Sequence, residues 1–331
     1  MDCKVLKQYP FFRTRYRLAA AFLVSLFLVH SSHIVHAGSA AQGFRLATSS
    51  DRAESFVIGR VARSARKHSK RVSALADQIA EGLSGFGYKK GASLIAENLE
   101  DMIKHLKSGA VDMISETAYG AVELADKGGA TLLAHEWKDG VPYYRSVIVA
   151  RKDSGLNDLQ SLRGKSMALE DSSSTTAYFI PLTIVHRAGL PTRRMQSPRT
   201  RRLPDTVNYL FAQGETNQIS LVLNKAVDVA AFSSLNWEMI SEQNEKILQL
   251  HKIIYTSRPI VRSLVLLRKD MKVAVREKIM EILENLDQSD EGRHILKKYN
   301  NVEQFTTLTD EALASLMWVR KLREPFKREM P

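Results

Sequence analysis

The sequence has little of what enzymes and metalloproteins commonly use. It contains one cysteine, Cys3, and its nine histidines do not recur at the spacing of a metal-binding helix. It has no P-loop, no glycine fingerprint for a dinucleotide and no serine in a nucleophile elbow. We therefore predict no metal site, no bound cofactor and no catalytic residue.

The N-terminus has the features of a signal peptide. Apolar residues 18–29 form a run too short to cross a bilayer comfortably, and Val35 and Ala37 are small residues where a signal peptidase reads. Five basic residues precede this run: Lys4, Lys7, Arg13, Arg15 and Arg17. We predict that residues 1–37 are removed; a retained anchor is the alternative.

Removal of residues 1–37 would also remove Cys3, so disulfides and thiolate metal sites are excluded from the mature chain. Export without disulfides favours a bacterial periplasm. The same cleavage removes five basic residues and Asp2, which lowers the formal net charge from +12 to +8. No later apolar run is long enough to span a membrane.

Beyond the leader, short apolar strands alternate with amphipathic helices. Strands are predicted at residues 44–47, 94–96, 111–114 and 130–134, and helices at 72–83, 99–106 and 118–127. The pattern restarts with strands at 144–151, 165–169 and 227–232, and helices at 156–162, 175–188 and 216–223. A strand at 261–268 and helices at 271–286 and 308–322 complete the chain. This alternation predicts an α/β fold with mostly parallel sheets flanked by helices.

Two segments resemble each other across the halves of the chain. HLKSGAVDMISET (105–117) and VLNKAVDVAAFSS (222–234) both run from a helix end through a Val-Asp pair into a small apolar strand. We expect two lobes with a cleft between them. Lobe one would comprise residues 38–144 and 260–331, and lobe two residues 145–259, because the chain would cross near residues 144 and 260.

The stretch ALEDSSSTTAYFIP (168–181) gathers five hydroxyl residues after a predicted strand and at the start of a predicted helix. We call residues 172–176 the hydroxyl segment. The first N–H groups of a helix have no intrahelical partner, and together with the macrodipole they form an anion site. Ligands of open α/β sheets bind at the carboxyl ends of strands. The alternative is that the segment only caps the helix.

The stretch DGVPYYRSVIVARKDSGLNDLQSLRGKSMALEDSSSTTAYFIP (139–181) resembles the core of the PhnD-like phosphate, phosphite and phosphonate binding proteins. This resemblance extends weakly over residues 90–270. It implies a two-lobed type II periplasmic binding-protein fold and the solute receptor of an ABC importer. It also implies that Ser174, Thr175 and Thr176 bind the oxyanion, that Tyr144 lines the pocket at the hinge and that Asp171 braces the loop.

The sequence departs from the family pattern at two donor positions. Alignment on Asp112 places Glu116 where the family has an aromatic residue, and alignment on Asp228 places Glu215 where it has a histidine. A buried carboxylate repels an oxyanion unless it is protonated or bridged by a cation. We therefore expect a ligand other than a plain dianionic phosphate, for example one whose amine could pair with Glu116 or Glu215, with these two acids setting selectivity. The alternative is that both acids cap helices at solvent.

The predicted function is capture of a small anionic solute in the periplasm by a monomer that delivers it to an ABC permease. Basic residues at 60–71 and 193–202 are interpreted as solvated faces, with docking on a membrane surface or transporter subunit as the alternative. Nucleic acid is not expected as a partner. Two other functions stay open: a ligand-sensing input to a membrane sensor kinase, and an enzyme on a related bilobal fold.

Overall fold

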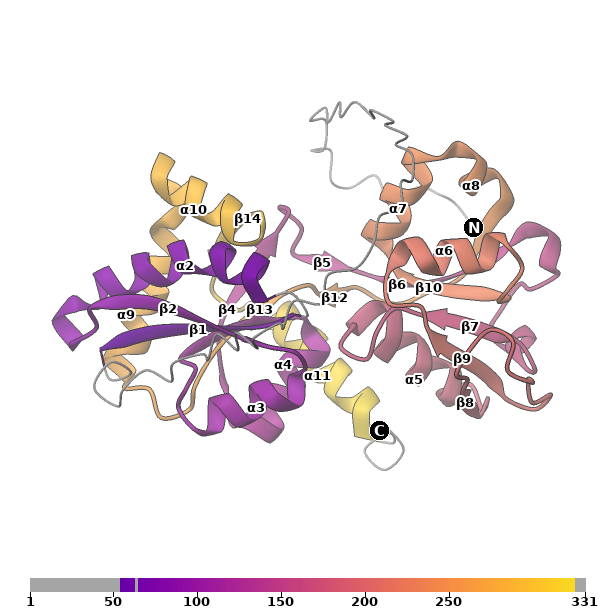
Figure 1. Ribbon diagram of the computed structural model, residues 1–331, viewed down its shortest axis with the longest axis horizontal. Helices are drawn as coiled ribbons and strands as arrows, with labels where there is room; N and C mark the ends of the chain where they lie inside the picture. Colours follow the sequence, from indigo (N-terminus) through magenta and orange to yellow (C-terminus); the bar gives the residue numbers. More distant parts are fainter. Residues whose placement is uncertain (1–53, 63–64, 325–331) are drawn as a thin grey trace, which may run out of the picture. The chain divides into compact units, whose positions relative to one another are not determined.

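The computed structural model describes residues 54–62 and 65–324. The predicted signal peptide (1–37) and the predicted strand at 44–47 lie outside the described residues. The described residues form two six-stranded sheets and one two-stranded ribbon, with helices packed on the sheets (Figure 1). This arrangement confirms the predicted α/β class.

The first sheet has the strand order β14-β4-β13-β3-β1-β2. Strand β1 pairs in parallel with β2 and β3, whereas β13 runs antiparallel to β3 and β4. The sequence pattern missed β1, although Phe56 and Ile58 are fully buried. The strands of this sheet are β1 (Ser55–Val61), β2 (Lys90–Ala96), β3 (Met113–Glu116), β4 (Thr131–Lys138), β13 (Leu264–Leu267) and β14 (Val302–Thr306).

The second sheet has the order β11-β6-β10-β7-β9-β8. Strand β7 pairs in parallel with β9 on one side and β10 on the other, and β6 runs antiparallel to β10. The strands of this sheet are β6 (Ser146–Arg151), β7 (Ser166–Leu169), β8 (Thr192–Arg194), β9 (Val207–Phe211), β10 (Val229–Ser233) and β11 (His251–Thr256). The carboxyl ends of the parallel strands of each sheet therefore lie at one edge of that sheet.

The two-stranded ribbon joins the sheets. Strand β5 (Tyr143–Tyr144) leads from β4 into β6, and β12 (Ile260–Val261) leads from β11 back into β13. The two strands pair antiparallel, with Ile260 opposite Tyr144. The chain thus passes between the sheets twice, and the two crossings are hydrogen-bonded to each other.

Helices cover both faces of each sheet (Figure 1). On the first sheet, α2, α9 and α10 pack around one apolar cluster, and α3, α4 and α11 around another. On the second sheet, α5 covers one face, and α6, α7 and α8 pack on the other. The helices are α2 (Ala65–Gly82), α3 (Leu99–Lys107), α4 (Ala118–Gly128), α5 (Ile180–Arg187), α6 (Glu215–Leu223), α7 (Ser234–Gln243), α8 (Glu245–Leu250), α9 (Val273–Asn285), α10 (Asp290–Asn300) and α11 (Asp310–Arg323).

Two predicted helices differ in detail. The prediction of a helix at 156–162 is wrong, because the helical part of this segment is one 3-10 turn, Gln160–Leu162. Hydrogen bonds between Asp158 and Ser161 stabilise a local turn there instead. The helix expected at 175–188 begins as a π-helical turn, Thr175–Phe179, before α5 continues it. Among the helices of the described part of the chain, none combines the length and hydropathy that crossing a bilayer requires.

Candidate functional site

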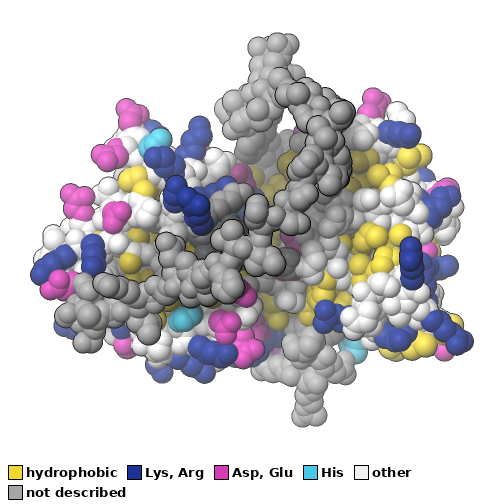
Figure 2. Space-filling view, in the orientation of Figure 1, with side chains coloured by type: hydrophobic (Ala, Val, Ile, Leu, Met, Phe, Trp, Pro, Cys, Tyr) yellow, Lys and Arg dark blue, Asp and Glu magenta, His cyan; other side chains and the backbone are white. Residues whose placement is uncertain are grey.

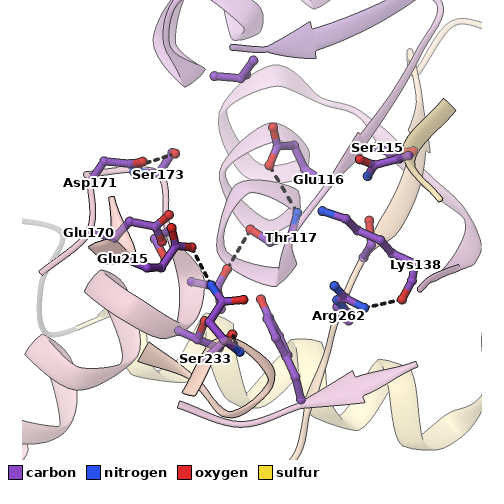
Figure 3. A pocket seen from close by; sticks show the side chains of 18 of the residues that line it. Ser115, Glu116, Thr117, Lys138, Glu170, Asp171, Ser173, Glu215, Ser233 and Arg262 are labelled. Atoms are coloured by element: carbon purple, nitrogen blue, oxygen red, sulfur yellow. Dashed lines mark hydrogen bonds between the residues drawn. The ribbon is translucent and has the colours of Figure 1, made fainter. Parts of the chain in front are cut away.

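A cavity of about 370 Å³ lies where strands of both sheets end, and its size is typical of a small-molecule site. All six predicted site residues line it: Glu116, Tyr144, Ser174, Thr175, Thr176 and Glu215. They arrive from β3, β5, the turn after β7 and the start of α6. Figure 3 shows their neighbours from close by. The structure therefore brings together residues that are up to 99 positions apart, from 116 to 215.

The hydroxyl segment forms a helix N-terminus at this cavity. Ser174 is the N-cap residue, and its Oγ accepts a hydrogen bond from the Ala177 N–H at 3.1 Å. Thr175 and Thr176 occupy the first turn, where backbone N–H groups lack intrahelical acceptors. Since the positive end of the helix dipole coincides with these donors, the turn can bind an anion.

The hydroxyl of Thr175 already has two partners at the start of α4. It accepts a hydrogen bond from the Tyr119 N–H at 2.9 Å and donates to Thr117 Oγ1 at 2.8 Å. Both partners lie at the start of α4, so the N-terminus of α4 meets the N-terminus that contains Thr175. In this structure Thr175 can therefore offer a ligand its backbone N–H, whereas its hydroxyl proton is directed to Thr117.

Tyr144 lies on β5, where the chain passes between the sheets, and its side chain is buried. Burial raises the pKa of its phenol to about 12, while the Arg262 charge and the hydroxyls of Thr175 and Thr176 oppose the shift. The phenol therefore stays protonated at neutral pH. It can donate a hydrogen bond beside the hydroxyl segment.

Glu116 ends β3 and lies over the start of α4. The Thr117 N–H donates to Glu116 Oε2 at 3.2 Å, and a Cβ on Gly120 would come within 2.8 Å of that oxygen. Burial raises the pKa of Glu116 to about 7, against the lowering effects of the Thr117 N–H and the Arg60 charge. The carboxyl group thus contacts a helix N-terminus, as the capping alternative requires, while it also lines the cavity.

Glu215 and Glu170 form a pair of acids beside the second sheet, one at the start of α6 and the other directly after β7. Glu215 is the first residue of α6 and accepts a hydrogen bond from the Asn236 amide. Burial, followed by the charge of Glu215, raises the pKa of Glu170 to about 7, and the Ser174 hydroxyl opposes the shift. The Glu170 carboxyl group therefore holds its proton closer to neutral pH than an ordinary glutamate does. We call Glu170, Asp171 and Glu215 the acidic wall.

Asp171 is the third member of the acidic wall. Its Oδ1 accepts hydrogen bonds from the Ser173 N–H at 2.8 Å and from the Ser173 hydroxyl at 2.6 Å. These bonds fix the loop that precedes the helix N-terminus, which is the geometry of a bracing residue.

Basic side chains line the opposite side of the cavity. Lys138 and Arg262 lie across the cavity from the acidic wall (Figure 3). Arg60, near the end of β1, also lines the cavity and donates to Asn300 Oδ1 at 3.2 Å. Sequence reasoning missed these three residues and Glu170. The only sequence signal for Glu170 was its place directly after a buried strand and next to Asp171.

No metal centre was expected from the sequence. In the described ranges, no three His, Cys, Asp or Glu side chains gather as metal ligands would. His135 is buried, and its Nε2 lies 3.0 Å from the Pro142 carbonyl oxygen, which gives it a structural partner. The described part of the cavity therefore offers backbone N–H groups at a helix N-terminus, hydroxyl groups and three acids beside that terminus. Basic side chains lie on the opposite side of the cavity.

Comparisons with solved structures identify the fold. XAC2383 from Xanthomonas citri bound to ATP superposes with a TM-score of 0.77 at 22% identity, covering 84% of this chain and 100% of that one. PhnD1 from Prochlorococcus marinus (MIT 9301) in complex with methylphosphonate gives a TM-score of 0.61 at 14% identity, covering 83% and 99%. The fold is that of type II periplasmic binding proteins.

The sequence comparisons are more specific. The phosphonates-binding periplasmic protein of Escherichia coli (strain K12) is 26% identical over 211 residues, which are 62% of this chain and 59% of that protein. The model of the family described as "ABC transporter, phosphonate, periplasmic substrate-binding protein" matches residues 61–313. A family so described consists of substrate-binding proteins, not enzymes. The chain belongs to this family of periplasmic substrate-binding proteins of phosphonate ABC transporters.

Proposed function

We propose that this protein captures a small dipolar oxyanion, with a phosphonate-type group at one end and an ammonium group at the other. The observation that carries the proposal is the position of the helix N-terminus at Ser174 directly beside the acidic wall, in one cavity. A helix N-terminus favours a negative charge, and a carboxylate pair favours a positive one. A ligand that carries both charges satisfies both features.

The oxyanion would accept hydrogen bonds from the N–H groups of Thr175 and Thr176, with Ser174 as the N-cap and Tyr144 as a phenol donor. The ammonium group would lie against Glu170 and Glu215, and Glu116 would set selectivity at the start of α4. A phosphonate without an amine would leave the acidic wall with no compensating charge. The names of two relatives, a phosphonates-binding protein and a complex with methylphosphonate, support a phosphonate-type anion.

In this proposal, residues 38–144 with 260–331 form one lobe, and residues 145–259 form the other. The ligand would contact both lobes and favour their closure, as in other two-lobed binding proteins. The closed, loaded monomer would deliver its ligand to an ABC permease. The proposed location is the periplasm, reached through a signal peptide at residues 1–37.

The test is a calorimetric titration of the mature protein with 2-aminoethylphosphonate and with methylphosphonate, together with a thermal-shift assay for each ligand. We expect 2-aminoethylphosphonate to bind at least about tenfold more tightly, which corresponds to about 1.4 kcal/mol. At 100 times its Kd it should add about 2.7 kcal/mol to the free energy of unfolding. ATP, the ligand of XAC2383, serves as a comparison ligand, and we expect it to bind weakly because the acidic wall repels a polyanion.

The matched variants are Glu170→Gln and Glu215→Gln. Each should reduce the preference for the amine-bearing ligand while methylphosphonate binds as well as before or better. Methylphosphonate binding more tightly than 2-aminoethylphosphonate to the native protein would contradict the assignment of the acidic wall. Failure of every phosphonate to bind would contradict the proposed function itself.

A further inference from the structure

Lys138 differs from the other cations of the cavity in what its charge contacts. Arg262 donates to Asp139 Oδ2 at 2.5 Å and to the Lys138 carbonyl oxygen, and Arg60 donates to Asn300. Both guanidinium groups are thus held by protein acceptors. Within the described ranges, the Lys138 ammonium has no hydrogen-bond or ion-pair partner, although the side chain lines the cavity.

An ammonium group in such a place is costly. The Lys138 side chain is half-buried, and burial, followed by the charge of Arg262, lowers its pKa, with the charges of Glu136 and Asp139 opposing. A half-buried charge that has no direct hydrogen-bond or ion-pair partner loses hydration free energy that no contact replaces. Groups held in this way are common at functional sites, because the ligand supplies the missing charge.

The backbone that carries Lys138 is fixed by several bonds. Arg262 donates to its carbonyl oxygen, and the next residue, Asp139, donates its N–H to the Asn301 carbonyl oxygen at 2.7 Å. The Asn301 amide donates in turn to Asp139 Oδ1 at 2.8 Å. The end of β4 is therefore held in place before any ligand arrives, which is the condition for a precise charge–charge contact.

We propose that Lys138 is a specificity-determining residue whose ammonium group pairs with an ionised oxygen of the ligand bound at the Ser174 helix N-terminus. This inference rests on the proposed function and deepens it. The anion would be contacted from two directions, by backbone N–H groups of lobe two and by the ammonium group of lobe one. The acidic wall lies on the other side of the cavity, so the ammonium end of the ligand would point away from Lys138 (Figure 3).

This assignment changes the preferred form of the anion. Neutral donors alone would accept any small oxyanion, whereas an ammonium group opposite them favours one that carries a full negative charge on the oxygen it meets. Sulfonates and phosphonates both qualify, but a neutral phosphonate ester would not. Dimethyl methylphosphonate is the neutral probe that separates charge from shape.

The experiment compares Lys138→Met and Lys138→Arg with the native mature protein, by calorimetric titration with methylphosphonate and 2-aminoethylphosphonate. Lys138→Met should weaken both ligands by about tenfold to a hundredfold, the range for a hydrogen bond to a charged group. Lys138→Arg should restore part of that loss. Lys298→Met, which removes an exposed lysine on α10, is the matched control and should leave both affinities unchanged.

Thermal unfolding of the ligand-free variants separates a binding role from a structural one. Lys138→Met should melt no lower than the native protein, because it removes a half-buried charge that has no direct partner in the described ranges. Binding of methylphosphonate to Lys138→Met within twofold of native, or tight binding of dimethyl methylphosphonate to the native protein, would overturn the inference and leave the proposed function intact. If the native protein binds neither charged probe, the proposed function fails first and this inference falls with it.

Discussion

Replacement of Thr175 by valine separates two roles that one hydroxyl can have. Thr117 is the N-cap of α4, but its side chain makes no capping hydrogen bond. The acceptor for the Tyr119 N–H, at the second position of α4, is instead Thr175 Oγ1 at 2.9 Å. Thr175 therefore caps α4 from a segment 56 residues further along the chain, and it also donates to Thr117.

Valine has the shape of threonine but cannot accept or donate. Thr175 is 1% exposed and Tyr119 is 9% exposed, so water cannot easily replace the lost acceptor. Loss of an N-cap acceptor costs about 0.5–2 kcal/mol, and the second hydrogen bond adds about 1 kcal/mol. We expect Thr175→Val to lower the free energy of unfolding by about 2 kcal/mol, or the melting temperature by about 4–8 °C.

The assay is urea and thermal unfolding of the ligand-free protein, with Thr175→Ser as the control that keeps the hydroxyl. Hydrogen exchange of the Tyr119 amide reports the same bond directly and should accelerate in Thr175→Val only. If Thr175→Val unfolds at the same urea concentration as the native protein, the hydroxyl does not cap α4 in solution. It would then be free to donate to a ligand, as the sequence alone suggested.

Two further predictions concern stability. Burial raises the pKa of Glu116 and Glu170 to about 7 each, from an ordinary 4.5, so the native state retains protons that the unfolded state releases. The free energy of unfolding should therefore fall as pH rises from about 4.5 to 7, by on the order of 2–3 kcal/mol for each of the two groups, and urea unfolding of the double glutamine variant should lack this slope. Gly91→Ala should destabilise by about 3 kcal/mol or more in thermal unfolding, because its Cβ would lie 2.2 Å from the backbone of Ala76 in α2. Gly85→Ala, whose Cβ meets nothing within 4 Å, is the control, and equal melting points for the two variants would contradict the packing argument.

The fold was largely predictable because each strand–helix unit carries local signals. Gly109 and Gly129 both have positive φ, 72° and 70°, and they end the units that contain α3 and α4, where the sequence predicted ends. Strand β1 was missed since Ser55–Val61 carries a glycine and an arginine among its apolar residues. Its place between β2 and β3 is decided by tertiary pairing, which periodicity alone does not report.

The site was predictable only where hydroxyl residues cluster. The run at 172–176 exceeds what one cap needs, and it does line the cavity through residues 173–176. Lys138 and Arg262 could not be predicted, because each is a single basic residue near a strand end, like many at the surface. Their meeting depends on the register of β4 and on the two crossings between the sheets.

The basic loop at 193–202 shows the same limit. It was interpreted as a solvated face, yet Arg202 forms an ion pair with Asp228 at 2.7 Å and Arg194 lies over the ring of Phe211, 5.0 Å from its centroid. Two of its five arginines therefore stabilise the second sheet. The charge count of a segment does not tell which members have partners.

The Val-Asp repeat explains why a helix N-terminus from each sheet lies at the cavity. Asp112 accepts from the Val57 N–H at 2.7 Å, and Asp228 accepts from the Ser166 N–H at 2.8 Å, so each aspartate ties the start of one strand to its parallel neighbour. Five residues further on, each strand ends in the N-cap of a helix that starts at the cavity, Thr117 for α4 and Ser233 for α7.

Because the unit is doubled, helix N-termini reach the cavity from both sheets, and we expect affinity for an anion to come mainly from their backbone N–H groups. What distinguishes one ligand from another must then come from charged residues that break the repeat. Glu116 occupies the position that Phe232 has in the second unit. Lys138 lies across the cavity from the acidic wall. We therefore expect selectivity to depend on four side chains, Glu116, Lys138, Glu170 and Glu215, and exchange of these charges should change the ligand without changing the fold.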